Sequence, residues 1–256
     1  MGQRLTPPDR SWNSRWLHAA ALLGLTLAAW HRVLWGTFQF DDFAAVLSAP
    51  TGLAWRIRPL LAWIWQRDLE IHGENASGFL AENLALHCLT VLVVYRLARR
   101  LLSPLGAFLA GAAFALQPAH TEVVAYVSGR STGLMSFLLL ASLLVWASAS
   151  EWQRPVARGL GMGLALLLFV SAVLVKEVAL VFPLLLLVWG TLGERRPHLA
   201  RRIAPVAGVA MVLAIGLAAI PRYRALASGR RCGSAGKLMR GPCDRRADTC
   251  VARRQA

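Results

Sequence analysis

QPAHTEVVAYVSGR, residues 117–130, is a polar stretch that separates two apolar segments, residues 105–116 and 134–147. A hairpin of two lipid-facing helices needs only a tight turn at this place, yet the stretch carries a His, a Glu, an Arg and several hydroxyl groups. Charged groups at or near membrane depth are costly, so they usually mark a binding site or a water-filled cavity. The stretch therefore predicts a membrane protein with a functional site at this turn.

The composition of the whole chain also indicates a membrane protein. Its 256 residues are 56% hydrophobic and 16% charged, with a mean hydropathy of +0.49, whereas an ordinary soluble domain carries about 25% charged residues. A formal net charge of +15 would suit a nucleic-acid-binding protein. However, no nucleic-acid-binding motif is present, and the basic residues cluster at the ends of apolar runs, as topology signals do.

Seven apolar runs predict an all-α integral membrane protein, a polytopic helix bundle with about seven spans. The runs cover residues 16–35, 79–97, 105–116, 131–149, 159–175, 178–192 and 203–220. About 20 apolar residues cross the hydrocarbon core, and arginine clusters mark cytoplasmic ends. This count places the N-terminus in the cytoplasm. It also puts one group of polar residues on the outer face, namely Asp41, Asp42, Glu122, Arg130, Lys176 and Glu177.

Two segments differ from these spans. The loop of residues 37–77 carries Trp55, Trp63 and Trp65, and tryptophan favours a membrane interface, so a short amphipathic helix over residues 60–69 is predicted on the outer surface. Residues 222–256 hold ten Arg or Lys residues against two Asp and no periodic apolar pattern. We therefore separate a membrane domain, residues 1–220, from a basic tail, residues 221–256, that is disordered or read out of frame.

Asp41 and Asp42 follow the first span directly and have two readings. Adjacent carboxylates are commonly solvated loop residues. Alternatively, one is a general base within hydrogen-bond reach of an acceptor hydroxyl while the other orients the site. Asn83 and His87, spaced i, i+4 on one face of the second span, likewise either hydrogen-bond a neighbouring helix or contact a substrate.

Cations accompany these groups on the predicted outer face. Arg58, Arg130 and Lys176 are suited to phosphate oxygens. Together with the carboxylates and His120, they indicate a reaction between a lipid-borne phosphate and a hydroxyl, driven by positioning and electrostatics. The same groups would also suit ion or substrate passage in a transporter.

Several motifs resemble a known family in order and spacing. They are Arg58-Pro59-Leu60, Asn83-Leu84-Ala85-Leu86-His87, Tyr95-Arg96-Leu97, the block of residues 114–130, and Val175-Lys176-Glu177. The sequence here is similar to the transmembrane and tetratricopeptide-repeat O-mannosyltransferases and their bacterial relatives, which are GT-C glycosyltransferases. The resemblance covers about residues 38–183, and its His-Thr-Glu to Gly-Arg block is the most specific part.

The resemblance implies a GT-C fold and the transfer of a sugar from a polyprenyl- or dolichyl-phosphate donor to an acceptor hydroxyl on the outer face, with protein O-glycosylation as the expected process. We expect the transfer to invert the sugar, because a direct displacement by the acceptor fits a single base. The acidic pair is the catalytic element of such enzymes, and the Lys-Glu segment and loop Arg lie near the donor. We therefore predict Asp41 and Asp42 as catalytic residues. The predicted donor site comprises Arg58, Asn83, His87, His120, Glu122, Arg130, Lys176 and Glu177.

The expected partners are membrane lipid, the lipid-phosphate sugar as substrate, and an acceptor protein or glycan. No residue set has metal-ligand spacing, so neither a metal nor another cofactor is expected. The predicted location is a bacterial inner membrane, or the endoplasmic reticulum membrane of a eukaryote, with a periplasmic or lumenal active face. Later spans and repeats of the family have no counterpart here, which predicts an N-terminal fragment. Two other functions stay open: a transporter or flippase for lipid-linked sugars, and an inactive membrane fragment.

Overall fold

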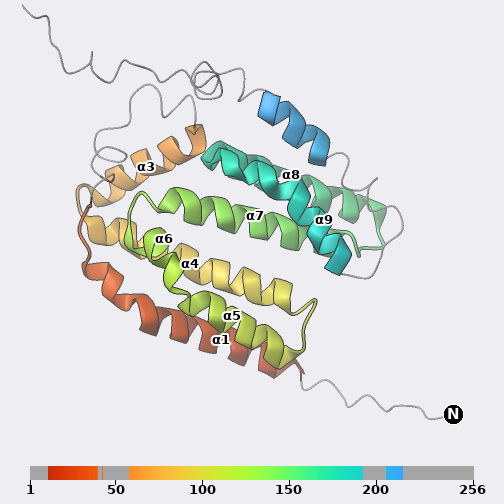
Figure 1. The fold of residues 1–256 in the computed structure, drawn as a ribbon, viewed down its shortest axis with the longest axis horizontal. Coiled ribbons are helices and arrows are strands. Elements are labelled where there is room, and N and C mark those ends of the chain that lie inside the picture. The colour runs from red at the N-terminus through yellow and green to blue at the C-terminus, as the bar shows by residue number, and fades with distance from the viewer. Residues whose placement is uncertain (1–10, 40–41, 43–57, 193–205, 216–256) are drawn as a thin grey trace, which may run out of the picture. The chain divides into compact units, whose positions relative to one another are not determined.

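The computed structural model describes residues 11–39, 42, 58–192 and 206–215, and every regular element within these ranges is a helix (Figure 1). The chain divides into two units, Met1–Val206 and Ala207–Ala256. Apart from a helix over Val206–Ile215, the elements discussed below belong to the first unit. The predicted tail and its boundary at residue 220 lie outside the described residues.

Four helical segments are long and apolar enough to cross a membrane. The first is α1, Ser11–Trp30, continued by a 3-10 turn, η1, His31–Trp35. The others are α4, Ala76–Ala98, α7, Arg130–Ala149, and α8, Pro155–Val175. The predicted all-α, multi-pass membrane class is therefore confirmed.

The other three predicted spans correspond to shorter helices. The third predicted span corresponds to α5, Pro104–Leu116. The sixth corresponds to η4, Glu177–Val181, followed by α9, Phe182–Leu192. The seventh corresponds to a helix over Val206–Ile215. The 13 residues of α5 extend about 20 Å, less than the roughly 30 Å hydrocarbon core. A total of seven spans thus stays a prediction.

The predicted amphipathic helix exists as α3, Pro59–His72, with its proline in the first turn, where the missing N–H has no helical partner to lose. Its buried face carries Leu61 and Asp68, whereas Trp63 is 53% exposed. Its position on the membrane surface stays a prediction, and Trp55 lies outside the described residues.

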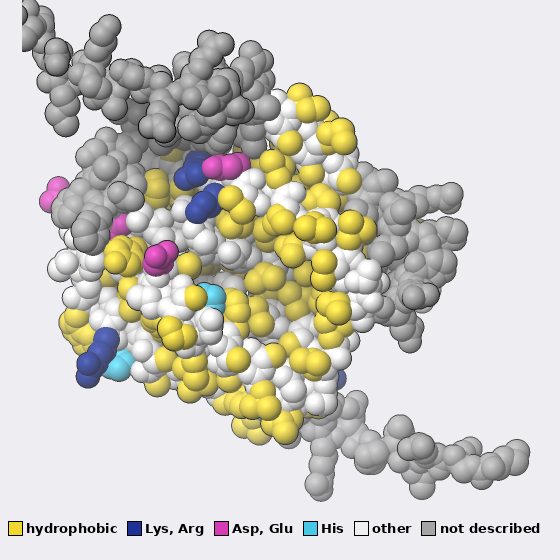
Figure 2. Space-filling model, in the orientation of Figure 1, with side chains coloured by type: hydrophobic (Ala, Val, Ile, Leu, Met, Phe, Trp, Pro, Cys, Tyr) yellow, Lys and Arg dark blue, Asp and Glu magenta, His cyan; other side chains and the backbone are white. Residues whose placement is uncertain are grey.

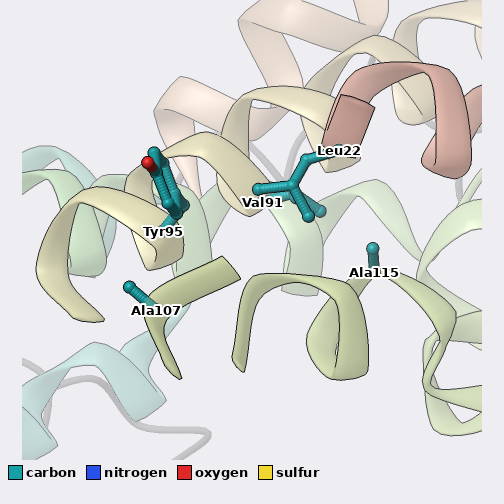
Figure 3. Packing of buried hydrophobic residues seen from close by; sticks show 5 residues of the cluster. All are labelled: Leu22, Val91, Tyr95, Ala107 and Ala115. Atoms are coloured by element: carbon teal, nitrogen blue, oxygen red, sulfur yellow. The ribbon is translucent and has the colours of Figure 1, made fainter. Parts of the chain in front are cut away.

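Helix α4 is the centre of the bundle, because it contacts α1, α5 and α7. The core on one side of it consists of Leu22, Val91, Tyr95, Ala107 and Ala115 (Figure 3). Small residues on α5 allow the helices to approach closely, as is usual between helices in lipid.

Helices α7 and α8 run antiparallel and pack against each other along their length. The buried hydroxyl of Ser142 on α7 donates to the carbonyl of Ala165 on α8 at 2.7 Å. Large apolar side chains cover much of the face in Figure 2, and the charged ones lie mainly toward the α3 end. Because the two helices are antiparallel, the start of α7 and the end of α8 meet at the same end of the bundle.

Candidate active site

The polar stretch 117–130 connects α5 to α7 through two short helices and a turn. The first is η3, Pro118–His120, which leads into α6, Thr121–Ala125. In the following turn, a Cβ atom on Gly129 would collide with the backbone carbonyl oxygen of Glu122, so glycine is required for this close approach. The connection is therefore packed tightly on itself.

Asp42 ties the segment after the first span to this turn. The residue is fully buried. One carboxylate oxygen accepts the backbone N–H of Ser128 at 2.7 Å, and the other accepts those of Gln39 at 3.0 Å and Val127 at 3.4 Å. Hydrogen bonds to an ionised carboxylate are stronger than neutral ones, so these three fix the residue in place. Asp41, its predicted catalytic partner, lies outside the described residues.

Arg130 lies at the centre of a buried polar network at the start of α7, with a side chain only 4% exposed. Its Nε donates to Oδ1 of Asn83 at 2.8 Å, and one terminal nitrogen donates to Glu82 at 2.6 Å and to Asp68. The other terminal nitrogen donates to the carbonyl of Phe79 at 2.6 Å. The guanidinium thus serves groups of the protein itself, and a role in donor binding stays a prediction.

The network continues into both neighbouring segments. The amide nitrogen of Asn83 donates to the carbonyl of Tyr126 at 2.7 Å, which links α4 to the turn. The ring of His72 lies 2.7 Å from the second carboxylate oxygen of Glu82. Two carboxylates, Asp68 and Glu82, therefore face the single guanidinium of Arg130.

Among the described residues outside the spans, Asp68 has a strongly shifted pKa. Burial raises the pKa of Asp68 to about 6; the positive charge of Arg130 opposes this rise and the negative charge of Glu82 adds to it. A carboxyl group with this pKa changes its charge close to neutral pH, so the charge balance of the network depends on pH.

A second cluster joins three segments that are far apart in the sequence. Arg58, at the start of α3, pairs with Glu177 through three hydrogen bonds of 3.0–3.3 Å. Lys176, after α8, donates to the hydroxyl of Thr132 at 2.8 Å. Since Thr132 lies in the first turn of α7, this cluster adjoins the Arg130 network.

The charged side chains of the second cluster are only partly removed from solvent. The side chains of Arg58 and Glu177 are 33% and 30% exposed. Burial lowers the pKa of Lys176, the nearby Arg58 lowers it further, and Glu177 opposes the change. Burial alone would raise the pKa of Glu177, but hydrogen bonds from Arg58 and the backbone outweigh burial. The pKa of Glu177 is therefore lowered. An anion placed here would offset the desolvation of Lys176.

The two predicted histidines form a third group with aromatic neighbours. The ring centroids of His87 and His120 lie 5.1 Å apart, and the ring of Phe114 lies 4.4 Å from that of His120, tilted by 50°. They line a mostly apolar cavity of about 240 Å³ between α4, α5 and α7. Nε2 of His120 is buried without a hydrogen-bond partner among the described residues, and burial lowers the pKa of this histidine. Glu122 is exposed on α6, apart from the three groups.

The structure thus gathers most predicted site residues around the start of α7 and adds partners that sequence reasoning missed. Asp68, His72, Glu82 and Thr132 were not predicted. A signal for Asp68 was available, because it lies seven residues after buried Leu61 and hence on the apolar face of α3. A carboxylate on such a face indicates a buried partner. Thr132 carries no comparable sign.

A family model described as dolichyl-phosphate-mannose-protein mannosyltransferase matches residues 56–220. The chain belongs to this family. The match includes Arg58, Lys176 and all residues of the Arg130 network, but it begins after the Asp41–Asp42 pair.

Individual mannosyltransferases of the curated set agree with this assignment. Protein O-mannosyl-transferase TMTC1 of Mus musculus is 30% identical over 194 residues, which are 63% of this chain and 21% of that protein. Protein O-mannosyl-transferase Tmtc2 of Drosophila melanogaster is 33% identical over 150 residues, or 57% of this chain and 16% of that protein. The predicted resemblance to this group is confirmed.

The chain spans about a fifth of the length of the first relative and about a sixth of the second. No solved structure matches it. Within the described residues, no group of three or more His, Cys, Asp or Glu side chains is arranged to hold a metal ion. The expectation of no metal or other cofactor stays a prediction.

Proposed function

We propose that this chain forms the catalytic end of a mannosyltransferase that moves mannose from a dolichyl- or polyprenyl-phosphate donor to a hydroxyl group of an acceptor protein. The single observation that carries the proposal is the convergence at the start of α7. There the Asp42-bound turn, the Arg130 network and the pair Lys176–Thr132 adjoin one another. Membership of the mannosyltransferase family supplies the reaction class.

In this proposal the two aspartates have different tasks. Asp42 is a positioning residue, because its carboxylate is buried and accepts three backbone N–H groups. Asp41 is the general base. The acceptor oxygen attacks the anomeric carbon of the sugar, its proton passes to Asp41, and the bond from that carbon to the phosphate oxygen breaks. The lipid phosphate leaves with the electron pair, and the sugar configuration inverts.

Lys176 is the proposed contact for the donor phosphate. Its ammonium is partly desolvated, which favours a bound anion. Arg58 is held against Glu177 and supports this site from α3. The donor and acceptor approach from the outer face, which is periplasmic in a bacterium and lumenal in the endoplasmic reticulum. Positive-inside placement of the arginine-rich ends supports this orientation.

The test uses the full chain, purified and placed in lipid nanodiscs, with labelled dolichyl-phosphate mannose and an acceptor protein. We expect Asp41→Asn to reduce transfer at least about 100-fold, as loss of a general base usually does, with an unchanged unfolding midpoint. Asp42→Asn should reduce transfer and also lower the midpoint, because it weakens the acceptors that hold the turn. The control Glu70→Gln, on the exposed face of α3, should change neither.

The other outcomes are equally informative. Full transfer by Asp41→Asn would refute its role as the base. The chain can also be placed in sealed vesicles. Movement of the labelled lipid across the vesicle membrane, without transfer of mannose, would favour a transporter over an enzyme. Absence of transfer by the unaltered chain would show that this chain does not catalyse the proposed reaction by itself.

A further inference from the structure

A polar cavity lies at the opposite end of the bundle from the candidate active site. It has a volume of about 570 Å³ and is lined by four arginines, Arg15, Arg96, Arg99 and Arg100. They come from the first turns of α1 and from the end of α4. Arg96 lies 13 residues beyond Asn83 of the Arg130 network, which corresponds to about 20 Å along the helix.

Among the described residues, a carboxylate neutralises only one of these four cations. Arg100 donates to both carboxylate oxygens of Glu151 at 3.0 Å and to the hydroxyl of Ser148 at 2.7 Å. No carboxylate among the described residues pairs with Arg15, Arg96 or Arg99. The cavity therefore carries an excess of positive charge, held by planar guanidinium forks that suit phosphate oxygens.

Arginines at the end of a span also act as topology signals, and such signals need no cavity. This cavity has two further features. Trp16, 60% exposed, is one of its lining residues, and tryptophan favours the headgroup level of a bilayer. One helical turn deeper than Arg15 and Ser148, the lining changes to Ala19 and Leu144. The walls are thus charged at the end of the bundle and apolar toward its middle.

From this arrangement we propose that the cavity binds the phosphate headgroup of an anionic phospholipid in the leaflet on the arginine-rich side, with an acyl chain along Ala19 and Leu144. A phospholipid has the same polarity gradient as the cavity wall. Free inorganic phosphate shares only the headgroup chemistry and would leave the apolar part unused. This site is independent of the proposed mannosyl transfer.

The test measures lipid retention by native mass spectrometry. The full chain in detergent is mixed with equal amounts of phosphatidylglycerol and phosphatidylcholine of identical acyl chains. We expect retention of phosphatidylglycerol at least about fivefold above phosphatidylcholine, and a loss of this preference by about five- to 25-fold in Arg96→Gln/Arg99→Gln, since each arginine contributes about a factor of five. The control Arg154→Gln/Arg158→Gln removes the same charge outside this cavity and should keep the preference.

Two further measurements distinguish a phospholipid headgroup from free inorganic phosphate as the bound group. Arg96→Lys/Arg99→Lys keeps the charge and should retain most of the preference, and it replaces the Gln pair if that pair does not fold. Inorganic phosphate at millimolar concentration should leave retention unchanged. Equal retention of the two lipids by the unaltered chain, an equal loss in the control, or displacement of phosphatidylglycerol by inorganic phosphate would overturn the proposal.

Discussion

At the scale of single residues, burial and hydrogen bonding distinguish groups that look alike in the sequence. Asp42 and Asp68 are both buried carboxylates, but their partners differ. Asp42 accepts three backbone N–H groups, whereas Asp68 shares one guanidinium with Glu82. Burial favours the protonated form of Asp68, the negative charge of Glu82 adds to this effect, and the positive charge of Arg130 opposes it.

We predict that Asp68→Asn flattens the pH dependence of stability between about pH 4 and pH 7. The pKa of Asp68 rises from 3.8 to about 6 in the folded state, so the folded chain binds this proton more tightly than the unfolded chain. The resulting stabilisation is complete below about pH 4 and is lost as the pH rises through about 6. The change in pKa corresponds to about 3 kcal/mol at most.

The measurement is the thermal unfolding midpoint in detergent at a series of pH values. Relative to Asp68→Asn, the unaltered chain should lose stability between about pH 4 and pH 6. Glu70→Gln, an exposed change on the same helix, should keep the original slope. An equal slope in Asp68→Asn would show that another group titrates in its place.

At the scale of elements, the connection between α5 and α7 depends on close backbone contact. We expect Gly129→Ala to destabilise the chain by about 1–3 kcal/mol or more, because the new methyl group meets the carbonyl of Glu122 and neither backbone can yield easily. Gly163→Ala on α8, where a Cβ atom has no neighbour within 4 Å, should instead stabilise its helix slightly. Thermal unfolding midpoints of both variants check the pair, and a neutral Gly129→Ala would contradict this account of the turn.

The helices themselves were largely predictable from the sequence. Apolar runs predicted 131–149 and 79–97, and the structure places α7 at Arg130–Ala149 and α4 at Ala76–Ala98. The number of spans was less certain because a short apolar run such as α5 has the composition of a span without its length. The break at Lys176 was also visible, since a cation and a carboxylate interrupt an apolar run there.

The partners of the polar residues were not predictable in the same way. The sequence marks Arg130 as exceptional, but its carboxylate Asp68 lies 62 residues earlier and Glu82 lies 48 residues earlier. Such pairs are decided by which helices meet, and this is a property of the tertiary packing. Residues of the candidate site could therefore be proposed from the sequence. Which of them position other groups and which are free to bind a ligand could be proposed only from the hydrogen bonds and ion pairs in the structure.

At the scale of the whole molecule, the arrangement predicts two chemically different ends. Basic side chains cluster where α4 ends, and the carboxylate-rich network lies where it begins. We predict that single cysteines at Glu122 and Arg154, in a background without the four native cysteines, differ in labelling. A membrane-impermeant maleimide should label Glu122→Cys on intact cells, and Arg154→Cys only after permeabilisation. The reverse result would invert the orientation of the chain and with it the proposed active face.

The partnership of Asp42 with Val127 and Ser128 also sets an order of events during biosynthesis. The carboxylate leaves the ribosome 85 residues before the first of these partners, which at typical synthesis rates corresponds to about 4–17 s. Throughout that interval Asp42 lacks the two backbone N–H groups of this turn. A nascent chain therefore completes the hydrogen bonds of Asp42 only when the segment leading into α7 has been made, so the geometry on which the proposed function rests forms late in synthesis.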